Sequence, residues 1–206
     1  MQSIMVDMGR FSEAADEIIK GISDAIGQVD PSQLEGFIDT LVEARVEERT
    51  ILVVGAGRSG LVGKAFAMRL MHLGYSTYVM GETINPSMTK GDLALVISGS
   101  GSTTLPVTIA EMAKSIGVKI LVVTSNPDSP LGRTADLTVV VPGRSKVARE
   151  DEYHSRQLLG EHESLAPMGT IFENSCMVFL DSLIAELMDR LEESEDDMRR
   201  RHAAIE

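Results

Sequence analysis

Five short apolar runs, separated by longer helical stretches, place the strongest constraint on the fold of this chain. The runs are bounded mainly by Gly, Ser or Asp and cover residues 51–54, 76–79, 93–97, 120–123 and 137–141. Helical patterns lie between them at residues 58–73, 103–116 and 129–134. Because strand–helix–strand units form right-handed crossovers, this alternation predicts an α/β fold with a parallel sheet. We expect a flavodoxin-like doubly wound sheet of five parallel strands in the order 2-1-3-4-5.

Helices are predicted on both sides of this core. Apolar residues recur at helical spacing before residue 49, and Asp30-Pro31 ends one helix and caps the next. A long helix is expected from Pro167 onward, with Pro in its first turn. We therefore expect one domain over residues 1–206, made of N-terminal helices (1–48), a sheet core (49–141), a polar excursion that could form a lid (142–166) and C-terminal helices (167–206).

Composition excludes several classes of partner. The 206 residues carry a formal net charge of −12, and acids gather near the C-terminus, so the chain repels polyanions and is not expected to bind nucleic acid. The single cysteine, Cys176, cannot form an internal disulfide, which indicates a reducing compartment. No apolar run reaches the length of a membrane span, and the acidic start is unlike a signal peptide. We expect a cytoplasmic protein with no membrane partner.

Two loops follow strands and open helices, which is the usual place for phosphate binding. The first, GAGRSG at residues 55–60, has the spacing of a dinucleotide fingerprint, and Glu82 lies where such a site needs an acid, so an NAD-dependent oxidoreductase is one alternative. The second, SGSGST at residues 98–103, presents several hydroxyls beside a helix N-terminus and is typical of a phosphomonoester cradle. A simple helix cap accounts for only one of those hydroxyls.

The second loop also carries a resemblance to a known family. SGSGST stands where the sugar isomerase (SIS) superfamily has S-x-S-G-x-T. Within that superfamily the chain resembles the 6-phospho-3-hexuloisomerases over nearly its whole length. The matching stretches, in the same order, are VVGAGRSGLVGKAFAMRLMHLGYSTYVMGETINPSM, ISGSGST, PMGTIFENSCMVFLDSLIAELM and RHAAIE.

This resemblance implies an isomerase that interconverts D-arabino-3-hexulose 6-phosphate and D-fructose 6-phosphate in the ribulose monophosphate route of formaldehyde fixation. It implies no metal or organic cofactor, and usually a homotetramer. It assigns the phosphate to Ser98, Ser100 and Thr103, first-loop contacts to Gly57 and Ser59, and the catalytic base to Glu173. The excursion at 144–166 is longer than the usual family linker and leaves the shape of the lid open.

Further residues are candidates on chemical grounds. An enediolate oxygen needs donors or a cation, which Arg58, the first-loop N–H groups or a histidine could supply. His202 is the histidine favoured for catalysis, because it lies in the tail that resembles the family ending and could cross into a neighbouring subunit. Ser102 adds a hydroxyl for the substrate. Glu82 and Thr83 either contact sugar hydroxyls or belong to a capped loop. The four histidines are too dispersed for a metal site.

Three alternatives remain open from the sequence. One is another SIS-type isomerase of aldose or ketose phosphates, although the arabinose-phosphate type usually has an extra regulatory module. Another is a non-catalytic phosphosugar-binding regulator, which normally carries a DNA-binding motif that this acidic chain lacks. The NAD-dependent oxidoreductase is the third. In every case the apolar faces of the terminal helices favour a homo-oligomer.

Overall fold

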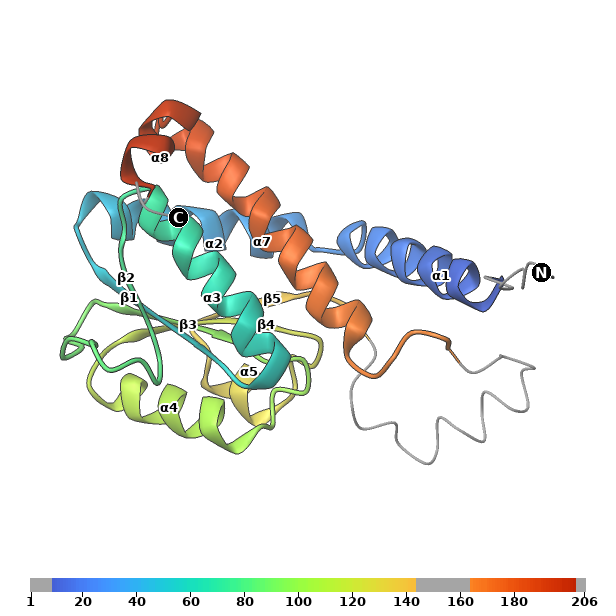
Figure 1. Ribbon diagram of the computed structural model, residues 1–206. Helices are drawn as coiled ribbons and strands as arrows, with labels where there is room; N and C mark the ends of the chain where they lie inside the picture. Colours follow the sequence, from blue (N-terminus) through green and yellow to red (C-terminus); the bar gives the residue numbers. More distant parts are fainter. Residues whose placement is uncertain (1–8, 144–163, 203–206) are drawn as a thin grey trace.

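The computed structural model describes residues 9–143 and 164–202 and contains one five-stranded parallel sheet (Figure 1). Its order is β2-β1-β3-β4-β5, which confirms the predicted doubly wound topology. The strands are β1 (Thr50–Gly55), β2 (Ser76–Val79), β3 (Leu93–Ile97), β4 (Lys119–Thr124) and β5 (Leu137–Val140). Most of the excursion predicted at 142–166 lies outside the described residues.

Alternate side chains of the central strands enter two separate apolar cores, because successive residues of a strand point to opposite faces of the sheet. Ile51 and Val53 of β1 pack into the larger core, whereas Leu52 and Val54 pack into the smaller one. The larger core lies under α2 (Pro31–Val46), α3 (Gly57–His72) and α7 (Thr170–Arg190). The smaller core lies under α4 (Thr104–Ser115) and α5 (Pro130–Thr134). Burial on both faces explains why these strands read as continuous apolar runs.

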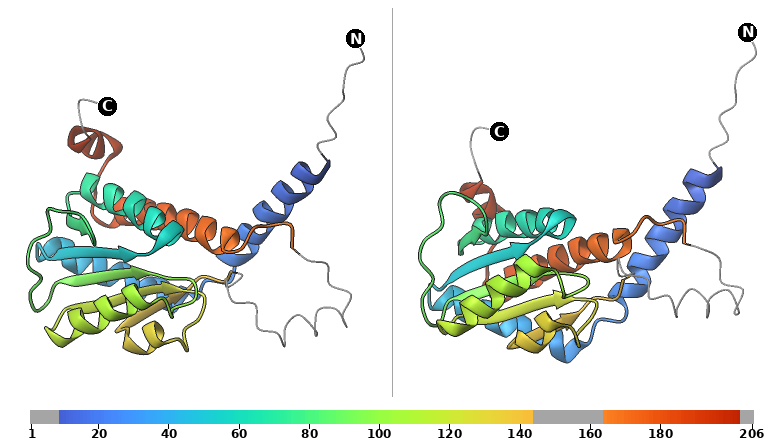
Figure 2. Two further views of the ribbon diagram at one scale, coloured as in Figure 1. Left: turned by 60° about the horizontal axis from the view of Figure 1, so that its bottom comes forward. Right: turned by 90° about the horizontal axis from the view of Figure 1, so that it is seen from below.

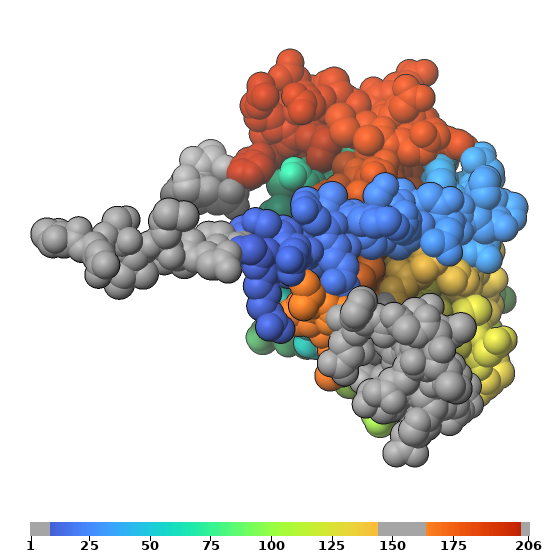
Figure 3. Space-filling view, turned by 90° about the vertical axis from the view of Figure 1, so that its right-hand side faces the viewer, coloured from blue at the N-terminus to red at the C-terminus, as the bar shows by residue number. Residues whose placement is uncertain are grey.

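The N-terminal helix α1 (Gly9–Ile26) extends away from the sheet and packs against α7 (Figure 2). Gly21 allows the close approach, since a Cβ at that position would lie 2.9 Å from Cδ1 of Ile171. Glu17 also receives a hydrogen bond from the backbone N–H of Leu165 at 2.9 Å. Figure 3 shows α1 and α2 following each other across one face of the molecule, beside α7. The first helix therefore holds the segment that leads into α7.

The long C-terminal helix begins later than the sequence indicated. Instead of starting at Pro167, α7 starts at Thr170, and the N–H of Thr170 donates to the carbonyl of Pro167 in a preceding turn. Gly169 causes the difference, because its left-handed backbone (φ 81°) ends the turn and serves as the N-cap residue. After α7 the chain turns and forms α8 (Glu195–Arg201), which packs on α3.

Within residues 9–143 and 164–202, no helix combines the length and the apolar character needed to cross a bilayer.

Candidate functional site

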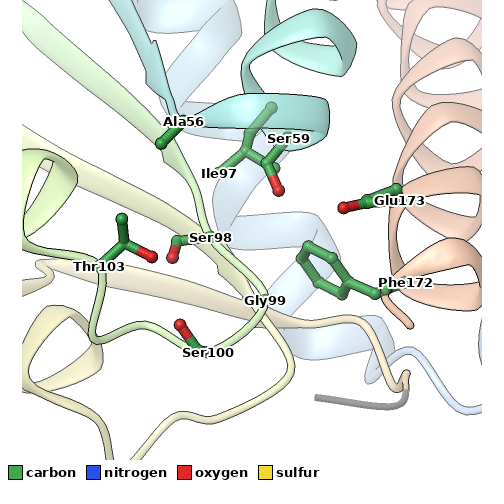
Figure 4. Close-up of a pocket in the computed structure, with 10 residues that line it drawn as sticks. Ala56, Ser59, Ile97, Ser98, Gly99, Ser100, Thr103, Phe172 and Glu173 are labelled. Atoms are coloured by element: carbon green, nitrogen blue, oxygen red, sulfur yellow. The ribbon is translucent and has the colours of Figure 1, made fainter. Parts of the chain in front are cut away.

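A cleft of about 420 Å³ opens where β1 and β3 end. At this point the chain from β1 continues into α3 on one face of the sheet, while the chain from β3 continues into α4 on the other. Diverging connections of this kind leave a crevice at the carboxyl edge of a doubly wound sheet. The lining residues come from both connections and from the start of α7: Ala56, Ser59, Ile97, Ser98, Gly99, Ser100, Thr103, Gly169, Phe172 and Glu173 (Figure 4).

The loop between β3 and α4 turns its hydroxyls into this cleft. Figure 4 shows the side-chain oxygens of Ser98, Ser100 and Thr103 directed toward one shared space. The carbonyl of Gly99 is held on the opposite side, where it accepts hydrogen bonds from the hydroxyl of Ser125 at 2.7 Å and from its N–H at 3.2 Å. This carbonyl is thus turned toward the end of β4, and the three hydroxyls remain on the cleft side. Such a lining suits an anion.

Gly101 makes this loop conformation possible. Its φ is 62°, in the left-handed region, and a Cβ there would lie 1.9 Å from Oγ of Ser129. Its carbonyl accepts a hydrogen bond from the N–H of Leu131 at 3.0 Å, which ties the loop to α5. Any side chain at position 101 would push the loop away from Ser129 and disperse the hydroxyls.

Three helix N-termini border the same cleft without a side-chain cap. The N-cap residues of α3, α4 and α7 are Ala56, Thr103 and Gly169, and none makes a side-chain capping hydrogen bond. By contrast, side chains cap the described helices α2, α5 and α8, through Asp30, Ser129 and Ser194. Because the first amides of a helix have no intrahelical acceptor and carry the positive end of its dipole, the cleft gathers positive electrostatic potential. This arrangement is that of an anion-binding site.

A buried carboxylate lies across the cleft from the hydroxyls. Glu173, in the first turn of α7, is 3% exposed and accepts a hydrogen bond from Nε of Arg58, the second residue of α3. In Figure 4 its carboxylate faces the hydroxyl of Ser59. One turn along α7, burial raises the pKa of the Cys176 thiol and the charge of Glu173 raises it further, so this thiol stays protonated. Among the residues that line the cleft, Glu173 is the one with an ionisable side chain.

Several lining residues escaped the sequence analysis because they carry no reactive group. Phe172 is 2% exposed and its ring lies against Gly99, where an added Cβ would be 2.9 Å from Cδ1. Ile97, the last residue of β3, provides a second apolar wall. The signal that could have found Phe172 and Ile97 was their position in the sequence, next to Glu173 and Ser98. An apolar wall beside the carboxylate limits the water that reaches it.

Six predicted residues lie outside this lining: Gly57, Arg58, Glu82, Thr83, Ser102 and His202. Ser102 is exposed, and its N–H donates to Oγ of Ser100 at 3.3 Å. Gly57 has a left-handed backbone (φ 57°) that starts α3 and is a neighbour of the lining rather than part of it. Glu82 forms an ion pair with Lys64 at 2.5 Å, and Thr83 beside it is exposed. Glu82 and Thr83 are thus not among the residues that line the cleft with the hydroxyl cluster.

His202 lies at the opposite end of α3 from the cleft. Its ring is 4.9 Å from that of His72, the last residue of α3, between ring centroids. At 1.5 Å per residue, the fifteen steps from Gly57 to His72 span roughly 22 Å. His202 is therefore remote from Glu173 of its own chain. Within residues 9–143 and 164–202, no cluster of three or more His, Cys, Asp or Glu side chains has the arrangement of a metal site.

Comparison with known proteins adds independent information. A sequence profile of the SIS domain matches residues 46–155. An uncharacterized protein of Aeropyrum pernix is 53% identical over 190 residues, which cover 92% of this chain and 90% of the relative. The 3-hexulose-6-phosphate isomerase of Methylomonas aminofaciens is 41% identical over 172 residues, 84% of this chain and 89% of that enzyme.

A solved structure agrees with these relatives. It is the crystal structure of a Methanococcus jannaschii protein, from which a molecular function of 3-hexulose-6-phosphate isomerase was inferred. It superimposes with a TM-score of 0.73 and 35% sequence identity, over 95% of this chain and 98% of that one. The similarity therefore spans the helices around the sheet as well as the two loops.

Proposed function

The chain belongs to the SIS-domain family, and from that premise we propose that it is a ketose-phosphate isomerase that interconverts D-arabino-3-hexulose 6-phosphate and D-fructose 6-phosphate. The relatives that carry a functional name among those described above are named for 3-hexulose 6-phosphate. Because similarity covers most of both chains, the reaction can be transferred as a hypothesis about the whole molecule rather than about one loop.

One observation carries the proposal: an anion-binding loop and a buried carboxylate share a single cleft. Ser98, Ser100 and Thr103 supply hydroxyl donors, and the uncapped N-terminus of α4 adds amides beside them. We assign the phosphate group to this end. A sugar phosphate held there would extend its carbon chain toward Ser59 and Glu173, which border the same cleft. Phosphate binding thus delivers the reacting carbons to the base.

The chemistry requires one base and one oxyanion site. Glu173 takes the proton from carbon 2 of the 3-ketose, the electrons of that C–H bond form a C2–C3 double bond, and the carbonyl oxygen at carbon 3 gains the negative charge. A proton then moves from the carbon 2 oxygen to the carbon 3 oxygen. Glu173 returns its proton to carbon 3, and the carbonyl forms at carbon 2. Amides at the N-terminus of α3, with Ser59, are the donors that we assign to the enediolate oxygen.

Several finer features belong to the same proposal. We expect catalysis without a metal or organic cofactor, because proton transfer by a carboxylate suffices for this isomerisation. We also propose a homotetramer in the cytoplasm, acting in the ribulose monophosphate route of formaldehyde fixation. In such an assembly, His202 could contribute to the site of a neighbouring subunit, which its position at the far end of α3 excludes within one chain.

A coupled assay tests the reaction. Purified protein is incubated with 3-hexulose 6-phosphate, and fructose 6-phosphate is detected with an auxiliary enzyme. We expect turnover by the unmodified protein, and a loss of at least about 10³-fold in kcat for Glu173→Gln, because the amide cannot accept the proton. Affinity for fructose 6-phosphate, measured by calorimetry, should change little, since the hydroxyl loop is intact.

The matched control is Asp181→Asn, which changes an exposed carboxylate of the same helix to an amide. It should retain full activity. No turnover by the unmodified protein would refute the proposed reaction, whereas normal turnover by Glu173→Gln would refute only the assignment of the base.

A further inference from the structure

The ion pair between Arg58 and Glu173 differs from every other ion pair that joins two described residues. The Glu173 side chain is 3% exposed, whereas each of the other carboxylates is at least 14% exposed. A charged carboxylate that is removed from water needs a compensating partner, and exposed surface pairs do not face this cost. The Arg58 guanidinium is therefore the compensating partner of a buried carboxylate.

The arginine itself is poorly placed to serve packing. Its side chain is 56% exposed, and it leaves the first turn of α3 at the mouth of the cleft. Nε makes the only hydrogen bond that the Arg58 side chain forms with described residues. A guanidinium presents five N–H donors in a planar fork, and this contact uses one of them.

Orientation is the second contribution that this contact makes. Glu173 can rotate about several side-chain bonds, but the hydrogen bond from Nε to Oε2 fixes one carboxylate oxygen. The carboxylate lies on the side of the Ser59 hydroxyl (Figure 4). A general base must lie within hydrogen-bonding reach of the proton that it removes, so a fixed carboxylate is an advantage.

We propose that Arg58 is a positioning residue of the active site, which holds the Glu173 carboxylate in place in the cleft through the hydrogen bond from its Nε. This inference rests on the proposed function, because it assumes that Glu173 is the base.

Kinetics of Arg58 variants test the proposal. For Arg58→Met we expect kcat to fall about 10²-fold, because the base is no longer held in place. KM should stay within about threefold, since the phosphate site is unaltered. Arg58→Lys should recover part of kcat, because it restores the charge but not the planar fork. The control is Arg69→Met, the same change at an exposed arginine on the same helix, which should match the unmodified protein.

Chemical rescue separates positioning from a structural defect. Low millimolar guanidinium chloride should raise kcat of Arg58→Ala several-fold, about as expected for restoring one charge-assisted hydrogen bond, and should leave Glu173→Gln unchanged. A rise in KM at constant kcat in Arg58→Met would overturn the inference, because Arg58 would then bind only the ground state. Absence of rescue together with normal kcat in Arg58→Lys and Arg58→Met would overturn it as well.

A double-mutant cycle of thermal stability distinguishes failure of this inference from failure of the proposed function. Thermal midpoints are measured for the unmodified protein, Arg58→Met, Glu173→Gln and the double variant. We expect Arg58→Met to lower the midpoint when Glu173 is present and to have a smaller effect in the Glu173→Gln background. If the shifts in thermal midpoint of the two single variants add up to the shift of the double variant, the pairing of Arg58 with Glu173 is contradicted, whatever the activity. If the coupling holds but the unmodified protein has no turnover, the proposed function fails and the inference fails with it.

Discussion

Neighbouring hydroxyls of the 98–103 loop have different surroundings in the folded chain. Ser98 is 4% exposed and Ser100 lines the cleft, whereas Ser102 is exposed and lies outside it. The backbone explains the difference, because Gly101 takes a left-handed conformation between Ser100 and Ser102. The family resemblance assigned the phosphate to Ser98, Ser100 and Thr103, with Ser102 as a further hydroxyl for the substrate. In the structure the first three line the cleft and Ser102 does not.

A pair of single substitutions measures this difference. Ser100→Ala should weaken binding of fructose 6-phosphate about 10-fold, because a hydrogen bond to a charged group contributes roughly 1.5–3 kcal/mol. Ser102→Ala removes the same hydroxyl from outside the lining and should change affinity less than about twofold, since exposed surface substitutions have small effects. Calorimetric titration of both variants provides the measurement. Equal losses would show that both serines contact the ligand.

At the scale of secondary structure, helix capping differs between the helices that begin at the cleft and those that begin elsewhere. The described helices that start away from the cleft, α2, α5 and α8, are capped by side chains, whereas α3, α4 and α7 begin at the cleft uncapped. A missing cap costs stability, typically about 1 kcal/mol per helix. The chain forgoes that stability at the three sites where a bound anion can take the place of the cap.

A new cap on α4 should therefore stabilise the protein and impair its function. Thr103 has the extended backbone of an N-cap residue (φ −65°, ψ 126°), so Asp at this position can accept a hydrogen bond from the first turn. We expect Thr103→Asp to increase the free energy of unfolding by about 0.5–1 kcal/mol. Its carboxylate should also repel the phosphate and reduce affinity more than about 100-fold.

The test compares thermal melting with calorimetry, and Thr103→Ser, which keeps a hydroxyl, is the matched control. That control should keep most of the affinity. A Thr103→Asp protein that binds fructose 6-phosphate normally would contradict the placement of the phosphate at α4.

The whole molecule has surfaces that its own chain does not cover. α1 exposes Phe11 (68%) and Ile19 (66%) where it extends from the sheet. At the far end of α3, His202 is remote from the Glu173 of its own chain. Both observations agree with the proposed homo-oligomer, in which apolar helix faces are covered and a histidine can enter a neighbouring site.

Mixed oligomers test the contribution of His202. We expect His202→Ala and Glu173→Gln each to lose activity when pure, by at least about 10²-fold, because each removes a group that transfers protons. After the two proteins are unfolded and refolded together, about a quarter of the sites should combine an intact Glu173 with an intact His202 from another subunit. Recovered activity near that fraction is the expected result. Mixtures as inactive as the pure variants would argue against a shared site, and full activity of pure His202→Ala would remove His202 from the mechanism.

Much of the architecture follows from local patterns. Strands that are buried on both faces produce unbroken apolar runs, and the predicted strands at 76–79 and 93–97 match β2 and β3 residue for residue. The 98–103 loop was predicted as an anion site because hydroxyls and glycines gather there before a helix. The start of α7 was predicted wrongly at Pro167, because Gly169 takes a left-handed conformation that the residue pattern did not reveal.

The sequence by itself determined the doubly wound sheet and the two loops at its carboxyl edge, because each depends on residues that are close together in the chain. Glu173 was singled out by the family resemblance. Only the tertiary structure decided which hydroxyls share the cleft, that three helices begin there without caps, and that Arg58 meets Glu173 across 115 positions. Those features arise when distant segments pack against one another, and a local pattern of residues does not specify such contacts.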